Sequence, residues 1–185
     1  METTLRVLTV CTHNRTRSVL AWGLIGQYLH EAGVDFRIAS AGFVAAGEPA
    51  TERTVRLLRR RGMELSGHRS RLVDARLVEL ADLIVCAEHR HVLDIAGSHP
   101  GSFGRTFTLP ELVRLGEAAG PARGDVSAWL ERISERRIAQ MDYLDADPQV
   151  IGELFDPTGE APAVWDRVFE EIDDLAARVA RLLAS

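Results

Sequence analysis

The feature that most constrains how this chain can fold is a strand, loop and helix pattern close to its N-terminus. Residues 5–10 are largely apolar, which is typical of a buried parallel strand, and apolar residues at helical spacing begin at Val19. The loop between them therefore ends at a helix N-terminus, where unpaired backbone N–H groups and the positive end of the helix dipole attract anions. The sequence predicts an anion-binding loop at residues 11–18.

This loop has a cysteine at its start and an arginine six positions later. The residues between Cys11 and Arg17 are enough to wrap around a tetrahedral oxyanion, with backbone N–H groups and the guanidinium on its oxygens. The same positive groups favour the thiolate form of Cys11, and Ser18 can donate a hydrogen bond to it. We interpret the loop as a phosphate cradle with a nucleophile beneath the phosphorus. Its candidate phosphate-binding residues are Thr12, His13, Asn14, Arg15, Thr16, Arg17 and Ser18.

The alternative is a core cysteine at a strand end, followed by a solvated arginine. A Cys-x5-Arg spacing alone would often occur by chance. The longer pattern Cys-x5-Arg-Ser at a strand-to-helix junction is much more specific for a phosphate-binding loop. Here the chain resembles the low-molecular-weight protein tyrosine phosphatase family, whose loop typically reads Cys-x-Gly-Asn-x-Cys-Arg-Ser. The matching segment is Cys11-Thr12-His13-Asn14-Arg15-Thr16-Arg17-Ser18, and Ser40-Ala41-Gly42 also resembles a family segment.

An Asp-Pro pair precedes the last amphipathic stretch of the chain. By its composition, Asp156-Pro157-Thr158-Gly159 is an ideal turn. In the resembling family such a pair supplies the general acid, so the resemblance implies this role for Asp156. It also implies two-step phosphomonoester hydrolysis through a cysteinyl-phosphate, catalysed by Cys11, Arg17 and Asp156 without a cofactor or metal.

The apolar patterns and the resemblance predict one α/β fold. It is a three-layer sandwich with a four-stranded parallel sheet, doubly wound and flavodoxin-like, whose site lies at the carboxyl ends of the strands. We expect a single phosphatase-like domain over residues 1–185, with a loop-rich insertion at 97–124. The predicted strands are 5–10, 36–40, 83–87 and 105–109, and the main predicted helices are 18–32, 51–61, 125–140 and 163–183, with a brief helix at 110–115 and another beginning at 88–91.

Three departures from the family pattern leave the substrate open. His13 replaces the usual glycine, Thr16 replaces a common second cysteine, and Thr158 stands where an aromatic residue often follows the Asp-Pro pair. The substrate is therefore a phosphorylated protein or another phosphomonoester, with phosphotyrosine preference in question. Two alternatives remain: an arsenate reductase that uses a low-molecular-weight thiol, and a non-catalytic module that binds phosphorylated proteins.

The composition of the chain indicates which kinds of partner and which cellular location to expect. The net charge of -5 argues against general nucleic-acid binding, and no apolar run approaches the ~18 residues of a membrane span. Two cysteines make no disulfide framework, so we expect a reduced, cytoplasmic protein. Oligomeric state leaves no signal in the sequence.

The remaining cysteine and histidines suggest no metal site. Cys86 falls on a predicted strand, whereas His89 and His91 fall on a helix, so the three side chains are not expected to face one point. We interpret Cys86 as a small core residue. For His68 we expect a structural hydrogen bond rather than acid–base chemistry.

Overall fold

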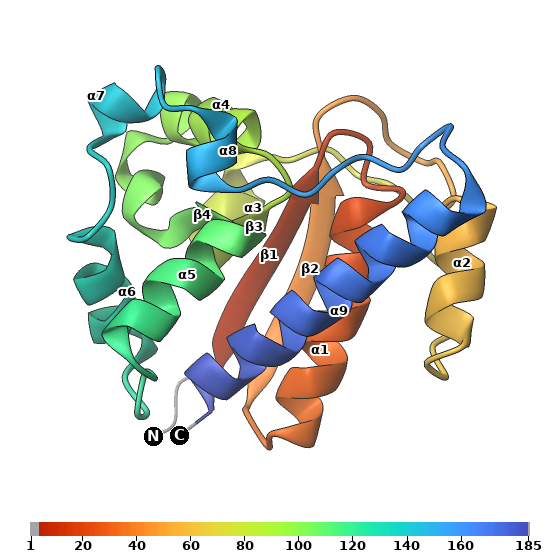
Figure 1. The fold of residues 1–185 in the computed structure, drawn as a ribbon, viewed down its shortest axis with the longest axis horizontal. Helices are drawn as coiled ribbons and strands as arrows, with labels where there is room; N and C mark the ends of the chain where they lie inside the picture. The colour runs from red at the N-terminus through yellow and green to blue at the C-terminus, as the bar shows by residue number, and fades with distance from the viewer. Residues whose placement is uncertain (1–3, 185) are drawn as a thin grey trace.

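The sheet is parallel and has four strands, as predicted. The computed structural model describes residues 4–184, and its strand order is β2-β1-β3-β4 (Figure 1). Every pairing in it is parallel. The two central strands, β1 (Leu5–Cys11) and β3 (Leu83–Cys86), are almost entirely buried, and β2 (Phe36–Gly42) and β4 (Thr106–Thr108) form the edges.

Helices cover both faces of this sheet and make it the middle of three layers. One face packs against α1 (Arg17–Glu31), α5 (Leu109–Ala119) and α9 (Pro162–Leu183), which Figure 1 shows running across the sheet. The other face is covered by α3 (Ala75–Leu80) and α4 (His89–Ser98). The shorter elements are α2 (Glu52–Arg59), η1 (Pro100–Arg105), α6 (Val126–Ser134), α7 (Gln140–Tyr143) and α8 (Pro148–Ile151).

Alternation along the central strands divides the core in two. Val7 and Val85 belong to the cluster on the α1 and α9 face, whereas Val10 and Cys86 belong to the cluster on the α3 and α4 face. This is the period of two expected of a strand that is buried on both faces. Because Cys11 lies in the first cluster and Cys86 in the second, the two cysteines are on opposite faces of the sheet.

The C-terminal half differs from the sequence prediction. Residues 97–124 are not mainly loop, because they contain η1, β4 and α5, and the predicted brief helix extends over the whole of α5. The helix predicted at 125–140 ends at Ser134, and Ile138 is 37% exposed. Beyond Ser134 the chain turns, with the backbone N–H of Arg137 donating to the carbonyl oxygen of Ser134, and the buried ion pair of Arg137 with Glu111 on α5 holds this turn. In the N-terminal half, helix α3 was missed, since its six residues are too few to show a clear period.

Two broader expectations concern the whole chain. Among residues 4–184, no helix has the length and apolar character needed to cross a membrane. The interpretation of residues 1–185 as a single phosphatase-like domain stays a prediction.

Candidate active site

The loop at residues 11–18 joins the end of β1 to the start of α1. It lies against Gly42, where a Cβ atom would stand only 2.7 Å from the backbone nitrogen of Asn14 and 2.8 Å from the carbonyl oxygen of Thr12. That oxygen accepts hydrogen bonds from the backbone N–H groups of Phe43 (2.8 Å) and Val44 (3.1 Å). The glycine of Ser40-Ala41-Gly42 is therefore what allows the second strand to support the loop so closely.

Asn14 fixes the conformation of the loop. It is fully buried and left-handed, with φ 53°, a region that asparagine tolerates better than most residues. Its Oδ1 accepts from the backbone N–H of Arg71 at 3.1 Å, and its Nδ2 donates to Ser18 Oγ at 3.1 Å. Its carbonyl oxygen accepts from His68 Nε2 at 2.8 Å. His68 thus has the structural hydrogen bond expected of it, and the loop is held from outside.

The backbone N–H groups of the loop are without acceptors in the described part of the chain. None of the N–H groups of residues 12–18 donates a hydrogen bond to another described residue. The side chains of Arg15 and Thr16 point away, since Arg15 Nε donates to the carbonyl oxygen of Pro49 at 2.8 Å and Thr16 Oγ1 lies 3.4 Å from Thr51 Oγ1. His13 is exposed at the rim. What these residues offer an anion is mainly their backbone.

Cys11 lies at the foot of the loop beside a hydroxyl group. Its Sγ is 3.0 Å from Ser18 Oγ, and the side chain is 3% exposed. Because Ser18 Oγ already accepts from Asn14 Nδ2, its own hydrogen is free to be donated to the sulfur. Cys86 lies on the other face of the sheet, and burial raises the pKa of its thiol well above the ordinary value, as expected of a core residue.

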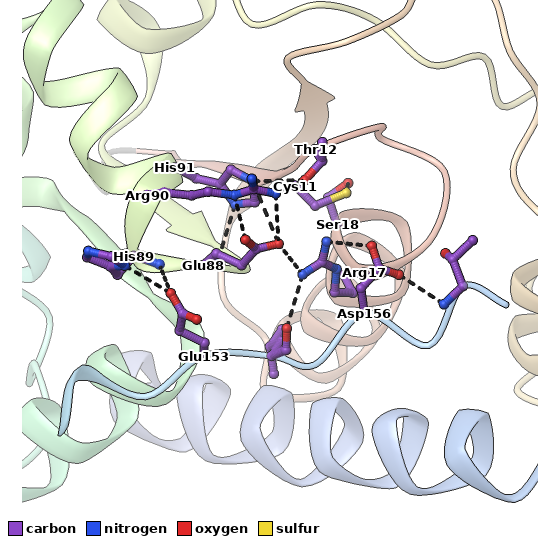
Figure 2. Close-up of polar contacts among 12 residues, drawn as sticks. Cys11, Thr12, Arg17, Ser18, Glu88, His89, Arg90, His91, Glu153 and Asp156 are labelled. Atoms are coloured by element: carbon purple, nitrogen blue, oxygen red, sulfur yellow. Dashed lines mark hydrogen bonds and ion pairs between the residues drawn. The ribbon is translucent and has the colours of Figure 1, made fainter. Parts of the chain in front are cut away.

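Arg17 is buried but does not use all its donors (Figure 2). Only 2% of the residue is exposed. Nη1 donates to Glu88 Oε1 at 2.5 Å and to the carbonyl oxygen of Leu154 at 3.1 Å, and Nη2 donates to Asp156 Oδ2 at 2.7 Å. The third guanidinium nitrogen, Nε, is buried and its N–H has no acceptor among residues 4–184. A buried N–H without an acceptor costs about 1–3 kcal/mol, so it indicates a place for a ligand oxygen.

Asp156 reaches the site from the segment that precedes α9. A hydrogen bond of 2.8 Å from the backbone N–H of Leu154 to the carbonyl oxygen of Ala87 ties that segment to the end of β3. Asp156 Oδ1 also accepts from the N–H of Thr158 at 3.0 Å, so the segment is a turn as well as a source of the carboxylate. Burial alone would raise the pKa of Asp156, but Arg17 and the Thr158 N–H outweigh it and hold the pKa below its usual value.

The start of α4 contributes three residues that the sequence analysis did not assign to the site. Glu88 accepts from Arg17, and its Oε2 lies 2.6 Å from Arg90 Nε. Burial opposes ionisation of Glu88, yet the nearby cations lower its pKa. His91 Nε2 lies 3.1 Å from Thr12 Oγ1, and burial lowers the pKa of His91 to about 4. Their place in the sequence could have indicated this role. They directly follow a central parallel strand, and sites in such sheets lie at the carboxyl ends of the strands.

No metal centre accompanies these groups. Within the described ranges, no three His, Cys, Asp or Glu side chains are gathered as a metal site would need. His89 pairs instead with Glu153, with 3.1 Å between His89 Nδ1 and Glu153 Oε1.

Comparisons with known proteins show which family the chain resembles. Residues 6–118 match a family model described as low molecular weight phosphotyrosine protein phosphatase. A probable low molecular weight protein-tyrosine-phosphatase, EpsP, of Ralstonia nicotianae is 33% identical over 128 residues, which are 69% of this chain and 85% of that protein. A protein-arginine-phosphatase of Bacillus subtilis is 29% identical over 132 residues, 70% of this chain and 87% of that protein.

Solved structures show the same fold. A mutant of YwlE from Bacillus subtilis superposes with a TM-score of 0.72 at 23% identity, covering 96% of this chain and 97% of that one. A low molecular weight protein tyrosine phosphatase from T. tengcongensis superposes with a TM-score of 0.69 at 24% identity, covering 95% and 97%. At these identities the likeness concerns the fold alone, and it confirms the predicted α/β architecture.

Proposed function

The chain belongs to the low molecular weight phosphotyrosine protein phosphatase family, a family of hydrolases, and we propose that Cys11, Arg17 and Asp156 perform its phosphomonoester hydrolysis. The observation that carries this assignment is the unused Nε–H of buried Arg17, in a loop whose backbone N–H groups also lack acceptors. Together they form a set of donors suited to the oxygens of a phosphoryl group.

In the first step, the thiolate of Cys11 attacks phosphorus in line. A P–S bond forms as the bond between phosphorus and the leaving oxygen breaks, and Asp156 gives its proton to that oxygen. Arg17 and the loop amides hold the other three oxygens, whose charge grows in the transition state. The hydroxyl of Ser18, 3.0 Å from the sulfur, stabilises Cys11 as a thiolate.

Asp156 must change its partner before this step. In the free protein its ion pair with Arg17 keeps it ionised. A phosphoryl group that binds Arg17 replaces this contact, and its negative charge then favours the protonated carboxyl.

In the second step, water hydrolyses the cysteinyl-phosphate. Asp156, now a carboxylate, takes a proton from water as the water oxygen attacks phosphorus. The P–S bond breaks, inorganic phosphate leaves, and the thiolate of Cys11 is restored.

We propose protein phosphotyrosine as the substrate, in keeping with the EpsP relative. Phosphoarginine in proteins is the second candidate. It is favoured by the relative named a protein-arginine-phosphatase, and by Thr158 at a position where an aromatic clamp for a tyrosine ring would be expected. We also propose a cytoplasmic location, which cell fractionation would test.

The test is phosphate release from three substrates: an aryl phosphate, a phosphotyrosine peptide and a phosphoarginine peptide. We expect turnover of the aryl phosphate and faster turnover of the phosphotyrosine peptide than of the phosphoarginine peptide. Arsenate-dependent oxidation of a low-molecular-weight thiol is measured beside them. Arsenate reduction without phosphate release would contradict the proposal, and binding of phosphopeptides without either reaction would indicate a binding module.

A further inference from the structure

The turn from β3 into α4 contacts the phosphate loop at the side chain of Thr12. Two donors from this turn reach its hydroxyl oxygen, since His91 Nε2 and Arg90 Nη2 each lie 3.1 Å from Thr12 Oγ1. Figure 2 shows both side chains extending from the turn toward Thr12, beside Cys11. The orientation of the Thr12 side chain therefore depends on His91 and Arg90, which are about 80 positions away in the chain.

The proton on His91 can be assigned from its partners. The backbone N–H of Glu88 donates to His91 Nδ1 at 3.2 Å, so this nitrogen carries a lone pair. The ring is 2% exposed and stacks on Phe43, and burial keeps it neutral near pH 7. A neutral imidazole has a single N–H, which must then be on Nε2. His91 therefore donates to Thr12 and does not accept from it.

The hydroxyl of Thr12 is consequently limited to one role. Arg90 also donates, because a guanidinium has no acceptor. Both lone pairs of Thr12 Oγ1 are then used, and the hydrogen of the hydroxyl has to be donated elsewhere. Among residues 4–184 it has no acceptor.

We infer that the hydroxyl of Thr12 donates a hydrogen bond to a phosphoryl oxygen of the substrate, and that His91 and Arg90 are the positioning residues that orient it. This rests on the proposed function. The carboxylate of Glu88 connects the two sets of donors, since its Oε1 holds Arg17 Nη1 and its Oε2 lies 2.6 Å from Arg90 Nε. The orientation of Thr12 is thereby coupled to that of Arg17, whose Nε–H also lacks an acceptor.

The first experiment compares Thr12→Val with Thr12→Ser. Valine keeps the shape and removes the hydroxyl, whereas serine keeps the hydroxyl. We expect Thr12→Val to lower kcat/KM for aryl phosphates by about 10- to 100-fold and to weaken inhibition by inorganic phosphate by a similar factor. Thr12→Ser should recover most of both losses. Melting temperatures of the two variants serve as the control for folding.

Three results would overturn the inference. One is a Thr12→Val enzyme with unchanged kcat/KM and unchanged phosphate inhibition. Another is a loss that serine does not recover, which would indicate a packing role for the methyl group. The third is a loss confined to substrates with poor leaving groups, which would place the hydrogen on the leaving oxygen. If the wild-type protein releases no phosphate, the proposed function fails instead.

The second experiment tests whether His91 acts through Thr12. His91→Phe keeps a ring against Phe43 but removes the donor, whereas His91→Gln can keep a donor at the position of Nε2. We expect about a 5- to 10-fold loss of kcat/KM in His91→Phe, with His91→Gln close to wild type. The double variant Thr12→Val with His91→Phe should be no worse than Thr12→Val alone. Additive losses would mean that His91 acts independently and would contradict the positioning role.

Discussion

The side chains of Arg17 and Arg137 are both almost completely buried, and they differ in whether every guanidinium nitrogen has an acceptor. Arg17 is at the loop and Arg137 is beside α5, where its side chain is 1% exposed. Arg137 Nε and Nη2 donate to the two oxygens of Glu111 at 2.8 Å each, and Nη1 donates to the carbonyl oxygen of Phe103 at 2.7 Å. Arg17 also faces carboxylates, but its Nε–H has none to bind.

Three aromatic rings surround the guanidinium of Arg137. Its guanidinium carbon lies 4.1 Å from the ring centre of Phe103, 4.5 Å from that of Phe107 and 4.7 Å from that of Tyr143. The hydroxyl of Tyr143 donates to Glu111 at 3.0 Å. The cluster joins the segment after α6 to α5, and none of its buried side-chain nitrogens or oxygens lacks a partner among residues 4–184. The comparison teaches that burial of a charge does not identify a site. What identifies it at Arg17 is a buried donor without an acceptor in a loop whose backbone N–H groups also lack acceptors among the described residues.

The largest effect should follow from removing the nucleophile beside Arg17. Cys11→Ser replaces the thiolate by a hydroxyl that is not ionised near pH 7, so we expect kcat to fall at least about 10⁴-fold. Because the two side chains are similar in size, the melting temperature should change little. Steady-state kinetics and calorimetry measure the two quantities. Appreciable phosphatase activity in the variant would refute the cysteine mechanism.

The same substitution at both arginines tests the comparison itself. Arg17→Lys should lower kcat/KM by about 10³-fold, because an ammonium cannot replace the planar set of donors. Arg137→Lys should leave kcat/KM within about threefold but reduce the free energy of unfolding by about 2–3 kcal/mol, since its bonds to Glu111 and Phe103 are lost. Urea unfolding and kinetics of both variants decide the matter. Loss of activity in a stably folded Arg137→Lys protein would break the distinction.

Asp156→Asn tests whether the carboxylate that pairs with Arg17 is the general acid. Without a proton donor, substrates with poor leaving groups should react about 10²- to 10³-fold more slowly, while good leaving groups should be affected less than about tenfold. The measurement is a series of aryl phosphates of increasing leaving-group pKa. Equal losses across the series would remove Asp156 from the acid role.

The smallest effect concerns pH and His91. Its folded pKa of about 4 lies below the ordinary 6.5, so the folded state binds fewer protons than the unfolded state between these values. The stability that depends on neutral His91 is complete above pH 6.5 and is lost as pH falls toward 4, by at most about 3 kcal/mol. Urea unfolding of wild type and His91→Gln over this range should show the smaller loss in the variant. Parallel curves would contradict it.

Much of the fold could be predicted from local patterns. The apolar strands, the long α1 and α9 and the loop at residues 11–18 were visible because strongly periodic or wholly apolar segments leave few alternatives. The helix predicted at 125–140 was wrong beyond Ser134. Ile138 fits a helical period, but the chain turns before it, and the buried pairing of Arg137 with Glu111 holds that turn. That pairing joins residues 26 positions apart and has no local signal.

The sequence by itself determined the loop: a cysteine at a strand end, an arginine at a helix start, and the backbone N–H groups between them. Only the tertiary structure decided which carboxylates meet that arginine. Glu88 is 71 positions from Arg17 and Asp156 is 139 positions away, yet both bond to its guanidinium. The physical reason for Glu88 is that the carboxyl ends of parallel strands lie at the same end of a sheet, so the residues that follow β1 and β3 become neighbours. Asp156 joins them because the backbone N–H of Leu154 bonds to the carbonyl oxygen of Ala87 and ties its segment to the end of β3.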